Sequence, residues 1–162
     1  MNEQTTAWSH LPNAAHIDWI IRDVEENPSD WCAAFMNTNL VVRGRDRFTA
    51  WCAAYYAAWH KAWHNDRDAA RDAACDAALD ADYEAALDVF SKAARRAARD
   101  ACLALIAYDP AGALFDLPLE QVRALAEQGD RVAVLMLPAC EVRAIRDKVD
   151  KPTSWCYTTH LH

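Results

Sequence analysis

Glycine is scarce in this chain, which has only Gly44, Gly112 and Gly129 among its 162 residues. Because glycine supplies most of the backbone conformations of tight turns, this scarcity disfavours a fold of many hairpin-linked strands. Alanine, the strongest helix former, dominates instead. The composition predicts an all-α fold: one domain over residues 1–162, built as a helical bundle around a long alanine-rich helical hairpin or bent helix, with short C-terminal helices.

Cysteine pairs and apolar runs of membrane length are also missing, and no leader segment is expected. None of the six cysteines lies two or three positions from another, so neither a zinc knuckle nor a redox pair is indicated. No apolar run approaches the ~18 residues that span a bilayer, and residues 1–10 are polar. We therefore expect a protein of the reduced cytoplasm that makes no membrane contact.

Motifs for catalysis and for nucleic-acid binding are absent as well. The sequence has no phosphate-binding glycine loop, no nucleophile elbow and no zinc quartet, which predicts a protein that is not an enzyme and has no cofactor. The formal net charge is −7 and no block is strongly basic, so direct contact with nucleic acid is not expected. An acidic surface could instead meet a basic partner.

The N-terminal region, residues 1–44, is predicted to contain two helices and a connector. Isoleucine and valine recur at helical spacing over residues 14–26, and Asn13 can cap this helix. Ser29 or Asp30 can cap a second, short helix over residues 31–36. Residues 37–44, including the β-like run at 40–42, are predicted to form the connector.

Residues 45–108 contain neither glycine nor proline and are predicted to be helical. An unbroken helix of this length would measure roughly 95 Å, too long for a compact domain of this size. Because Asn and Asp favour helix ends, breaks are plausible at residues 64–66 and 80–82. A break near Asn65 is favoured, which predicts helices over 46–64 and 66–108.

Residues 109–150 are predicted to form short helices, followed by an irregular tail over 151–162. Asp116 and Pro118 signal a helix start, and Gly129 suits the position just beyond that helix. Asp130 can cap the next helix, over 131–137. Pro138 then restarts or kinks the chain into a last helix over 138–149.

A period of four residues runs through the long segment. In the tetrads of residues 51–106, the first position is mostly large and the last two are mostly alanine. A helix turns by about 400° over four residues, so each column drifts by about 40° per tetrad and the buried face rotates. Such a helix must meet different neighbours along its length or wrap around one. The second position holds an unbroken column of acids: Asp68, Asp72, Asp76, Asp80, Glu84 and Asp88.

The acid column and the aromatic column that precedes it each allow two interpretations. The six acids could form a partner-binding surface that resembles a strand of phosphates, or a solvated face; their match to the helix dipole favours the second. The aromatic column could stack bases or grip a peptide, although aromatic stripes at helical spacing are more often core. Its members are Trp51, Tyr55, Trp59 and Trp63.

Two sets of residues have spacings that could bind a metal. His60 and His64 lie four residues apart with Asp68 four further on, but Lys61 stands where the metalloprotease motif has glutamate. Surface histidines are the alternative interpretation, and we predict no metal site. Cys156, His160 and His162 lie in the tail, which is not a preformed site.

Residues 101–139 read ACLALIAYDPAGALFDLPLEQVRALAEQGDRVAVLMLPA and follow the tetrads that start at Arg67. Together, the tetrads and this stretch cover residues 67–144, and this part of the chain resembles alanine-rich proteins of unknown function from bacteriophages and prophages. Small, acidic, non-enzymatic phage proteins often bind and block a host machine, including CRISPR effectors. The resemblance therefore implies a phage-encoded, anti-CRISPR-like inhibitor of a host defence system, but it brings no catalytic residues.

The partner expected for such an inhibitor is a host protein or nucleoprotein complex with a basic surface, bound through an acidic and aromatic helical surface in the host cytoplasm. The alternative is a virion structural or assembly protein that acts by helix-mediated oligomerisation. That alternative predicts a stable oligomer, for which a homodimer is the simplest form.

Overall fold

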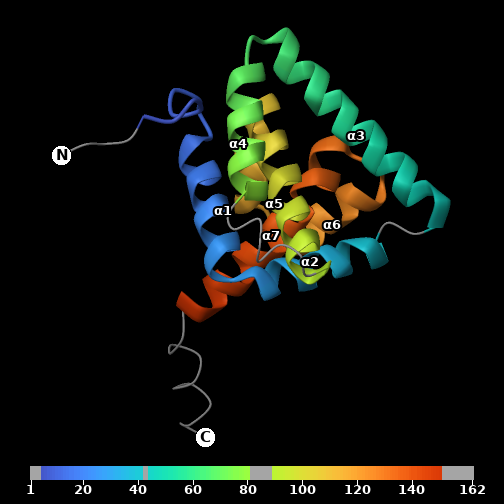
Figure 1. Cartoon of the computed structure of the whole chain (residues 1–162). Coiled ribbons are helices and arrows are strands. Elements are labelled where there is room, and N and C mark those ends of the chain that lie inside the picture. Colours follow the sequence, from blue (N-terminus) through green and yellow to red (C-terminus); the bar gives the residue numbers. More distant parts are fainter. Residues whose placement is uncertain (1–4, 42–43, 81–88, 151–162) are drawn as a thin grey trace, which may run out of the picture.

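The computed structural model describes residues 5–41, 44–80 and 89–150, which form helices joined by short turns (Figure 1). No residue in these ranges lies in a strand, which confirms the predicted all-α fold. None of the helices described here has the length and apolar character needed to cross a membrane. The elements are α1 (Ala14–Glu26), α2 (Pro28–Val41), α3 (Gly44–His64), α4 (Asp68–Asp80), α5 (Val89–Ala107), η2 (Asp109–Asp116, a 3-10 helix), α6 (Leu119–Glu127) and α7 (Arg131–Asp150).

The first two helices confirm one prediction and correct another. α1 begins and ends at the predicted residues. α2 is longer than predicted, because it starts at Pro28 and continues to Val41, so the connector expected over 37–44 is helical as far as residue 41. Proline suits the first helical turn, where its missing N–H would have no partner anyway. α2 packs on α5 and α7, and tertiary packing of this kind routinely overrides weak helix propensity.

The predicted break near Asn65 is confirmed. Asp66, which lies between α3 and α4, has a φ of 57°, a left-handed conformation that Asp and Asn tolerate better than most residues. The N–H of Asp66 donates to the carbonyl of Trp63 at 3.2 Å, and the N–H of Arg67 donates to the carbonyl of Ala62 at 2.7 Å. These are the two hydrogen bonds of a Schellman motif, which satisfies the last carbonyls of α3 and ends the helix.

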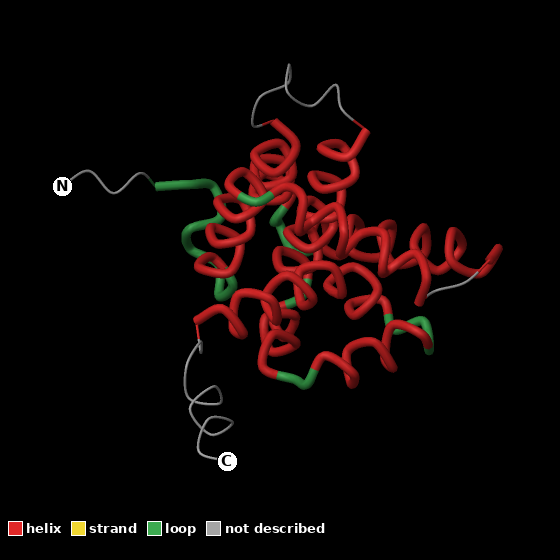
Figure 2. Tube along the Cα trace, turned by 90° about the horizontal axis from the view of Figure 1, so that it is seen from below, coloured by secondary structure: helices red, strands yellow, loops and turns green. Residues whose placement is uncertain are grey.

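A single helix over residues 66–108 is wrong, because α4 and α5 are separate antiparallel helices that lie side by side (Figures 1 and 2). Near the start of α4, Arg67 Nη1 donates to the carbonyl of Ile106. Near its end, the carbonyl of Ala78 accepts a hydrogen bond from Arg95 Nη1. The described residues of the long segment therefore form three helices, and the predicted hairpin of 46–64 with 66–108 is not confirmed.

Short helices resolve the drift of the four-residue period. Ala70, Ala74 and Ala78 of α4 are all buried, with at most 3% of their surface exposed. Over three alanines the column turns by only about 80°, so a helix of this length keeps the whole stripe against its neighbours. The small alanine side chain lets the backbones of α4 and α5 approach closely. Ala54, Ala58 and Ala62 of α3 stand in the same column and are buried as well, so the break between the two helices returns this column to the core.

α5 and α7 form the centre of the molecule. Every residue over 100–107 of α5 and over 133–142 of α7 is buried. α5 contacts α1, α2, α3, α4, α7 and η2, so it is surrounded by other helices. Burial all around a helix requires an apolar sequence on every face, as residues 101–107 (ACLALIA) provide.

The C-terminal turn is as predicted, but α7 is one helix rather than two. Gly129 follows α6 with a φ of 83°, and Asp130 Oδ1 accepts hydrogen bonds from the N–H groups of Val132 and Ala133 at 3.1 and 2.9 Å. α7 then continues through Pro138, so the predicted separate helices over 131–137 and 138–149 are wrong. An interior proline costs about 3 kcal/mol, which the burial of the residues on both sides offsets.

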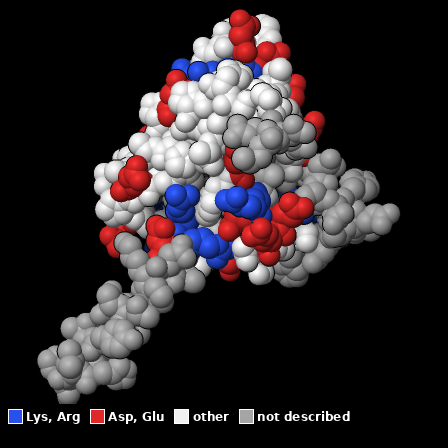
Figure 3. All heavy atoms as spheres, turned by 90° about the vertical axis from the view of Figure 1, so that its left-hand side faces the viewer, with Lys and Arg blue, Asp and Glu red and all other residues white. Residues whose placement is uncertain are grey.

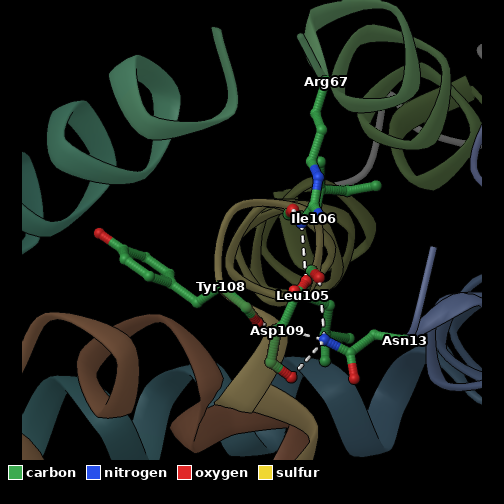
Figure 4. Close-up of polar contacts among 6 residues, drawn as sticks. All are labelled: Asn13, Arg67, Leu105, Ile106, Tyr108 and Asp109. Atoms are coloured by element: carbon green, nitrogen blue, oxygen red, sulfur yellow. Dashed lines mark hydrogen bonds and ion pairs between the residues drawn. The ribbon is translucent and has the colours of Figure 1, made fainter. Parts of the chain in front are cut away.

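Asn13 does not cap α1, contrary to the prediction, because its side chain lies at the C-terminal end of α5 (Figure 4). Asn13 Nδ2 donates to the carbonyl oxygens of Leu105, Tyr108 and Asp109 at 3.0, 3.2 and 3.1 Å. The last carbonyls of a helix have no partner within the helix, and buried ones require another donor. A residue of the N-terminal segment therefore completes α5.

Arg67 supplies a second donor at the same helix end (Figure 4). Its Nη1 lies 2.9 Å from the carbonyl oxygen of Ile106 and 2.7 Å from Asp109 Oδ1. A cation is favoured at the C-terminus of a helix, where the helix dipole is negative. The turn between α3 and α4 is thereby fixed to the end of α5.

A partly buried ionic network joins α1, α2 and α7. Asp23 accepts hydrogen bonds from Arg146 Nε at 2.9 Å and from Trp31 Nε1 at 2.9 Å, and Arg146 also pairs with Asp30 at 2.8 Å. Burial raises the pKa of Asp23, but the hydrogen bonds from Arg146 and Trp31 outweigh it, and the pKa lies below its ordinary value. Figure 3 shows acidic and basic side chains gathered side by side on the face around α1, so the two signs of charge are mixed there.

Candidate functional site

The aromatic column predicted from the tetrads forms a stack of rings along α3. The ring centroids of Trp51 and Tyr55 are 5.1 Å apart, and those of Tyr55 and Trp59 are 5.9 Å apart, with interplanar angles of 27° and 22°. These three side chains are half-buried against the core. Trp63, the fourth member, is 58% exposed. The interpretation as core is therefore confirmed for the first three rings but not for Trp63.

Two arginines from the neighbouring helices cover this stack. The guanidinium carbon of Arg71 on α4 lies 3.7 Å from the ring centroid of Trp59, and that of Arg99 on α5 lies 5.0 Å from the ring centroid of Tyr55. A desolvated cation over an aromatic face gains about 2 kcal/mol. Arg71 Nη1 also donates to the carbonyl of Trp59 at 3.2 Å. Arg71 thus holds α4 to α3 through both a ring and the backbone.

Asp100 closes the stack at its Trp51 end. Its Oδ2 accepts a hydrogen bond from Trp51 Nε1 at 2.7 Å, and its Oδ1 accepts two from Arg99 at 3.1 and 3.2 Å. Burial raises the pKa of Asp100, and Arg99 and Trp51 only partly offset this effect. Arg99 and Asp100 neutralise one another, and each contacts a ring of α3. The stack of Trp51, Tyr55 and Trp59, which we call the inner stack, therefore holds α3 to its neighbouring helices.

Beside this ring stack, α3 presents large apolar side chains to solvent. Phe48 is 68% exposed, Tyr56 61% and Trp63 58%. At about 100° per residue, these positions lie within about 80° of one another around the helix, and we call this surface the outer face of α3. Residues 48–64 contain no Asp or Glu and one Lys, in a chain of net charge −7. An exposed apolar patch with few charges is typical of a protein contact surface.

The inner stack supports the outer face. The rings of Phe48 and Trp51 have centroids 6.4 Å apart, and those of Tyr56 and Tyr55 6.1 Å apart. Each of these exposed rings therefore rests on a ring that a residue of α5 holds in place. Side chains that are already ordered lose less conformational entropy when a partner covers them.

Only part of the predicted acid column can be placed. Asp72 and Asp76 are exposed on α4, and Asp68 is half-buried at its start. Asp72 Oδ1 accepts a hydrogen bond from Arg71 Nε at 2.9 Å. The side chain of Asp80, together with Glu84 and Asp88, lies outside the described residues. Of these acids, Asp72 therefore borders the inner stack through Arg71.

The metal sites considered from the sequence do not form within the described residues. His60 and His64 are exposed on α3, but the turn after His64 places Asp68 on the next helix. In the part of the chain that the structure covers, no group of three or more His, Cys, Asp or Glu side chains could hold a metal. Cys156, His160 and His162 lie beyond that part.

The arginines that hold α3, α4 and α5 together were not predicted from the sequence. Arg67, Arg71, Arg95 and Arg99 all stand in the first column of the tetrads, which elsewhere holds large apolar side chains. Each of the four donates to a backbone carbonyl or a carboxylate of another helix or lies over a ring of α3. An arginine stem can be buried like a large apolar residue while its head finds polar partners. Arginine in the large column was the signal that could have identified these residues.

No family model matches this chain, and neither a curated protein nor a solved structure matches it.

Proposed function

We propose that this chain is a non-enzymatic protein-binding protein that contacts its partner through the outer face of α3. The observation that carries the proposal is the exposure of Phe48, Tyr56 and Trp63 on a helix face without carboxylates. Aromatic side chains bury roughly 150–250 Å² each when covered, and they dominate interface energetics. Aromatic enrichment and charge depletion are the features that distinguish the core of an interface from its rim.

Asp72 and Asp76 would contribute to the rim of this contact. They lie on α4, which packs against α3 where Arg71 covers Trp59. Charges at a rim mainly steer the encounter and change the rate of association, whereas buried apolar anchors set the rate of dissociation. The matching partner has a basic surface beside an apolar patch.

The resemblance to phage proteins supports a narrower form of the proposal. On that basis the partner is a host protein or nucleoprotein complex, and the chain inhibits a host defence system in the manner of an anti-CRISPR protein. The host cytoplasm is where such a complex would be met. The surface of the chain itself supports the broader proposal, an apolar protein contact with acidic residues nearby.

Binding to purified, immobilised CRISPR effector complexes tests the proposal. Trp63→Ala should weaken binding at least tenfold, mainly through faster dissociation, because tryptophan is the commonest anchor residue. Reversing Asp72 and Asp76 to lysine should slow association and reduce its dependence on salt. Met36→Ala is the matched control, since Met36 is 55% exposed but lies on α2.

Two results would reject the proposal. One is the absence of a complex with every effector examined. The other is a complex that Trp63→Ala binds as tightly as the unchanged protein does, because the contact would then lie elsewhere. If only the charge reversals are without effect, the acids have no part in binding and the apolar contact alone remains.

A further inference from the structure

We infer that the outer face of α3 also binds a second copy of this chain, as an antiparallel, two-fold symmetric pair of α3 helices. This inference rests on the proposed function in one respect, since it takes the outer face to be a protein contact. It adds the identity of one partner and the geometry of the pair. A covered outer face would shield its aromatic residues until another partner displaces the second copy.

The spacing of the exposed residues is self-complementary. Phe48 lies eight residues before Tyr56, and Trp63 lies seven residues after it. At 1.5 Å per residue these separations are about 12 and 10.5 Å along the helix axis. A two-fold axis near Tyr56 therefore places Phe48 of one copy opposite Trp63 of the other, with the tyrosines of both copies at the centre. In an isologous interface each contact of this kind occurs twice.

The distribution of charge favours this face over the rest of the surface. Two copies of a chain with net charge −7 repel one another, so association requires a surface that lacks acids. Residues 48–64 lack them, and their lysine, Lys61, lies away from the three aromatic residues around the helix. The acids of α4 could not face their own copies without like-charge repulsion. An antiparallel pair of α3 helices avoids that repulsion.

α3 is also placed where a second copy can reach it. It runs along the outside of the molecule, and its Gly44 end extends beyond the other helices (Figures 1 and 2). With roughly 60% of their surface free, three aromatic side chains offer about 350 Å² per copy. A standard interface buries about 800 Å² per partner, so the expected dimer is weak and depends on concentration.

An isologous contact closes on itself and stops at two copies. The inference therefore predicts a dimer and not the open assembly that a fibre or shell requires. A mass that kept rising beyond two copies with concentration would contradict it and would favour the virion assembly alternative.

A charge swap across the two-fold axis tests the inference. Sedimentation equilibrium should show the unchanged protein moving from one to two chains as its concentration is raised a hundredfold. Phe48→Lys alone and Trp63→Glu alone should each weaken the dimer at least tenfold. The variant carrying both should regain at least a tenfold tighter dimer than either single variant, because the new lysine and the new glutamate then face each other across the axis.

Ala124→Glu is the matched control, because Ala124 is exposed on α6, which packs on α2 and α7. It adds a charge without touching the aromatic residues and should leave the dimer intact. Circular dichroism of each variant shows whether the helices are retained.

The outcomes separate this inference from the proposed function. Dimerisation that the single variants lose and the double variant regains supports the antiparallel pair. A monomer at every concentration, or a double variant no better than the singles, overturns the pair. After such a result, the proposed function would still be supported if Trp63→Ala weakened binding to an effector. If no effector bound, the proposed function would be rejected even if the dimer formed.

Discussion

The side chain of Asn13 offers a sharp test of how the N-terminal segment and α5 depend on one another. Asn13 stands at the N-cap position of α1, where Asp is as favourable as Asn. Its amide nevertheless donates to three carbonyls at the end of α5 rather than capping α1. The two roles predict different effects for Asn13→Asp. A cap would be retained and stability unchanged, whereas at the end of α5 a carboxylate has no proton to donate and would face three carbonyl oxygens.

The cost of losing this amide can be worked out from its contacts. A neutral hydrogen bond contributes about 1 kcal/mol net, and a buried acceptor left without a partner costs about 1–3 kcal/mol. The carbonyl of Leu105 is buried, whereas Asp109 is exposed and water can replace the lost donor there. Asn13→Ala should therefore reduce the free energy of unfolding by about 2–3 kcal/mol. Asn13→Asp should reduce it further at neutral pH.

Urea unfolding followed by far-UV circular dichroism measures both variants. Gln121→Glu is the control for the same amide-to-carboxylate change, because Gln121 is exposed near the start of α6 and should change the free energy of unfolding by less than about 0.5 kcal/mol. If Asn13→Asp is as stable as the unchanged protein, Asn13 acts as a cap for α1 and its bonds to α5 contribute nothing.

Three further predictions concern packing, titration and thiol reactivity. In Gly112→Ala the new Cβ would lie 2.5 Å from Asn13 Oδ1 and 2.8 Å from His16 Cδ2. The free energy of unfolding should fall by about 1–3 kcal/mol, and the midpoint of thermal unfolding should fall with it. An unchanged midpoint would contradict this packing. Burial raises the folded-state pKa of Glu141 above 4.5. The stability that protonated Glu141 contributes below pH 4.5 is therefore lost as the pH rises through its folded-state pKa. Glu141→Gln should therefore gain stability relative to the unchanged protein between pH 4.5 and 7 in urea titrations, and a constant difference would refute this. Burial also raises the pKa of Cys75 to about 12, so mass spectrometry should show it alkylated only as fast as the chain unfolds, and rapid labelling in the folded state would disprove its burial.

Local signals were enough to predict the class of fold and several helix ends. The apolar spacing of α1, the cluster after His64 and the Gly129-Asp130 pair each act within a few residues of the chain. Features set by distant contacts could not be predicted in this way. The bond from Asn13 to Leu105 spans 92 positions, and no pattern near Asn13 indicates it. The continuation of α2 to Val41 likewise depends on packing against α5 and α7.

The candidate site was predictable only in outline. The tetrads identified the aromatic residues of α3, but a column with a four-residue period drifts and does not show which rings will be covered. The antiparallel return of α5 along α4 decides that question. It brings Arg99 and Asp100 to Tyr55 and Trp51, and it leaves Trp63 exposed.

Hydroxyl-radical footprinting read by mass spectrometry tests most directly whether the outer face of α3 is a protein contact surface. The oxidation rates of Tyr56 and Trp63 should fall several-fold as the protein concentration is raised, and again when a bound effector is present. The rate for Met36, which is exposed on α2, should stay constant in both series. Equal rates for Tyr56 and Trp63 under all these conditions would show that nothing covers this face and would contradict the assignment.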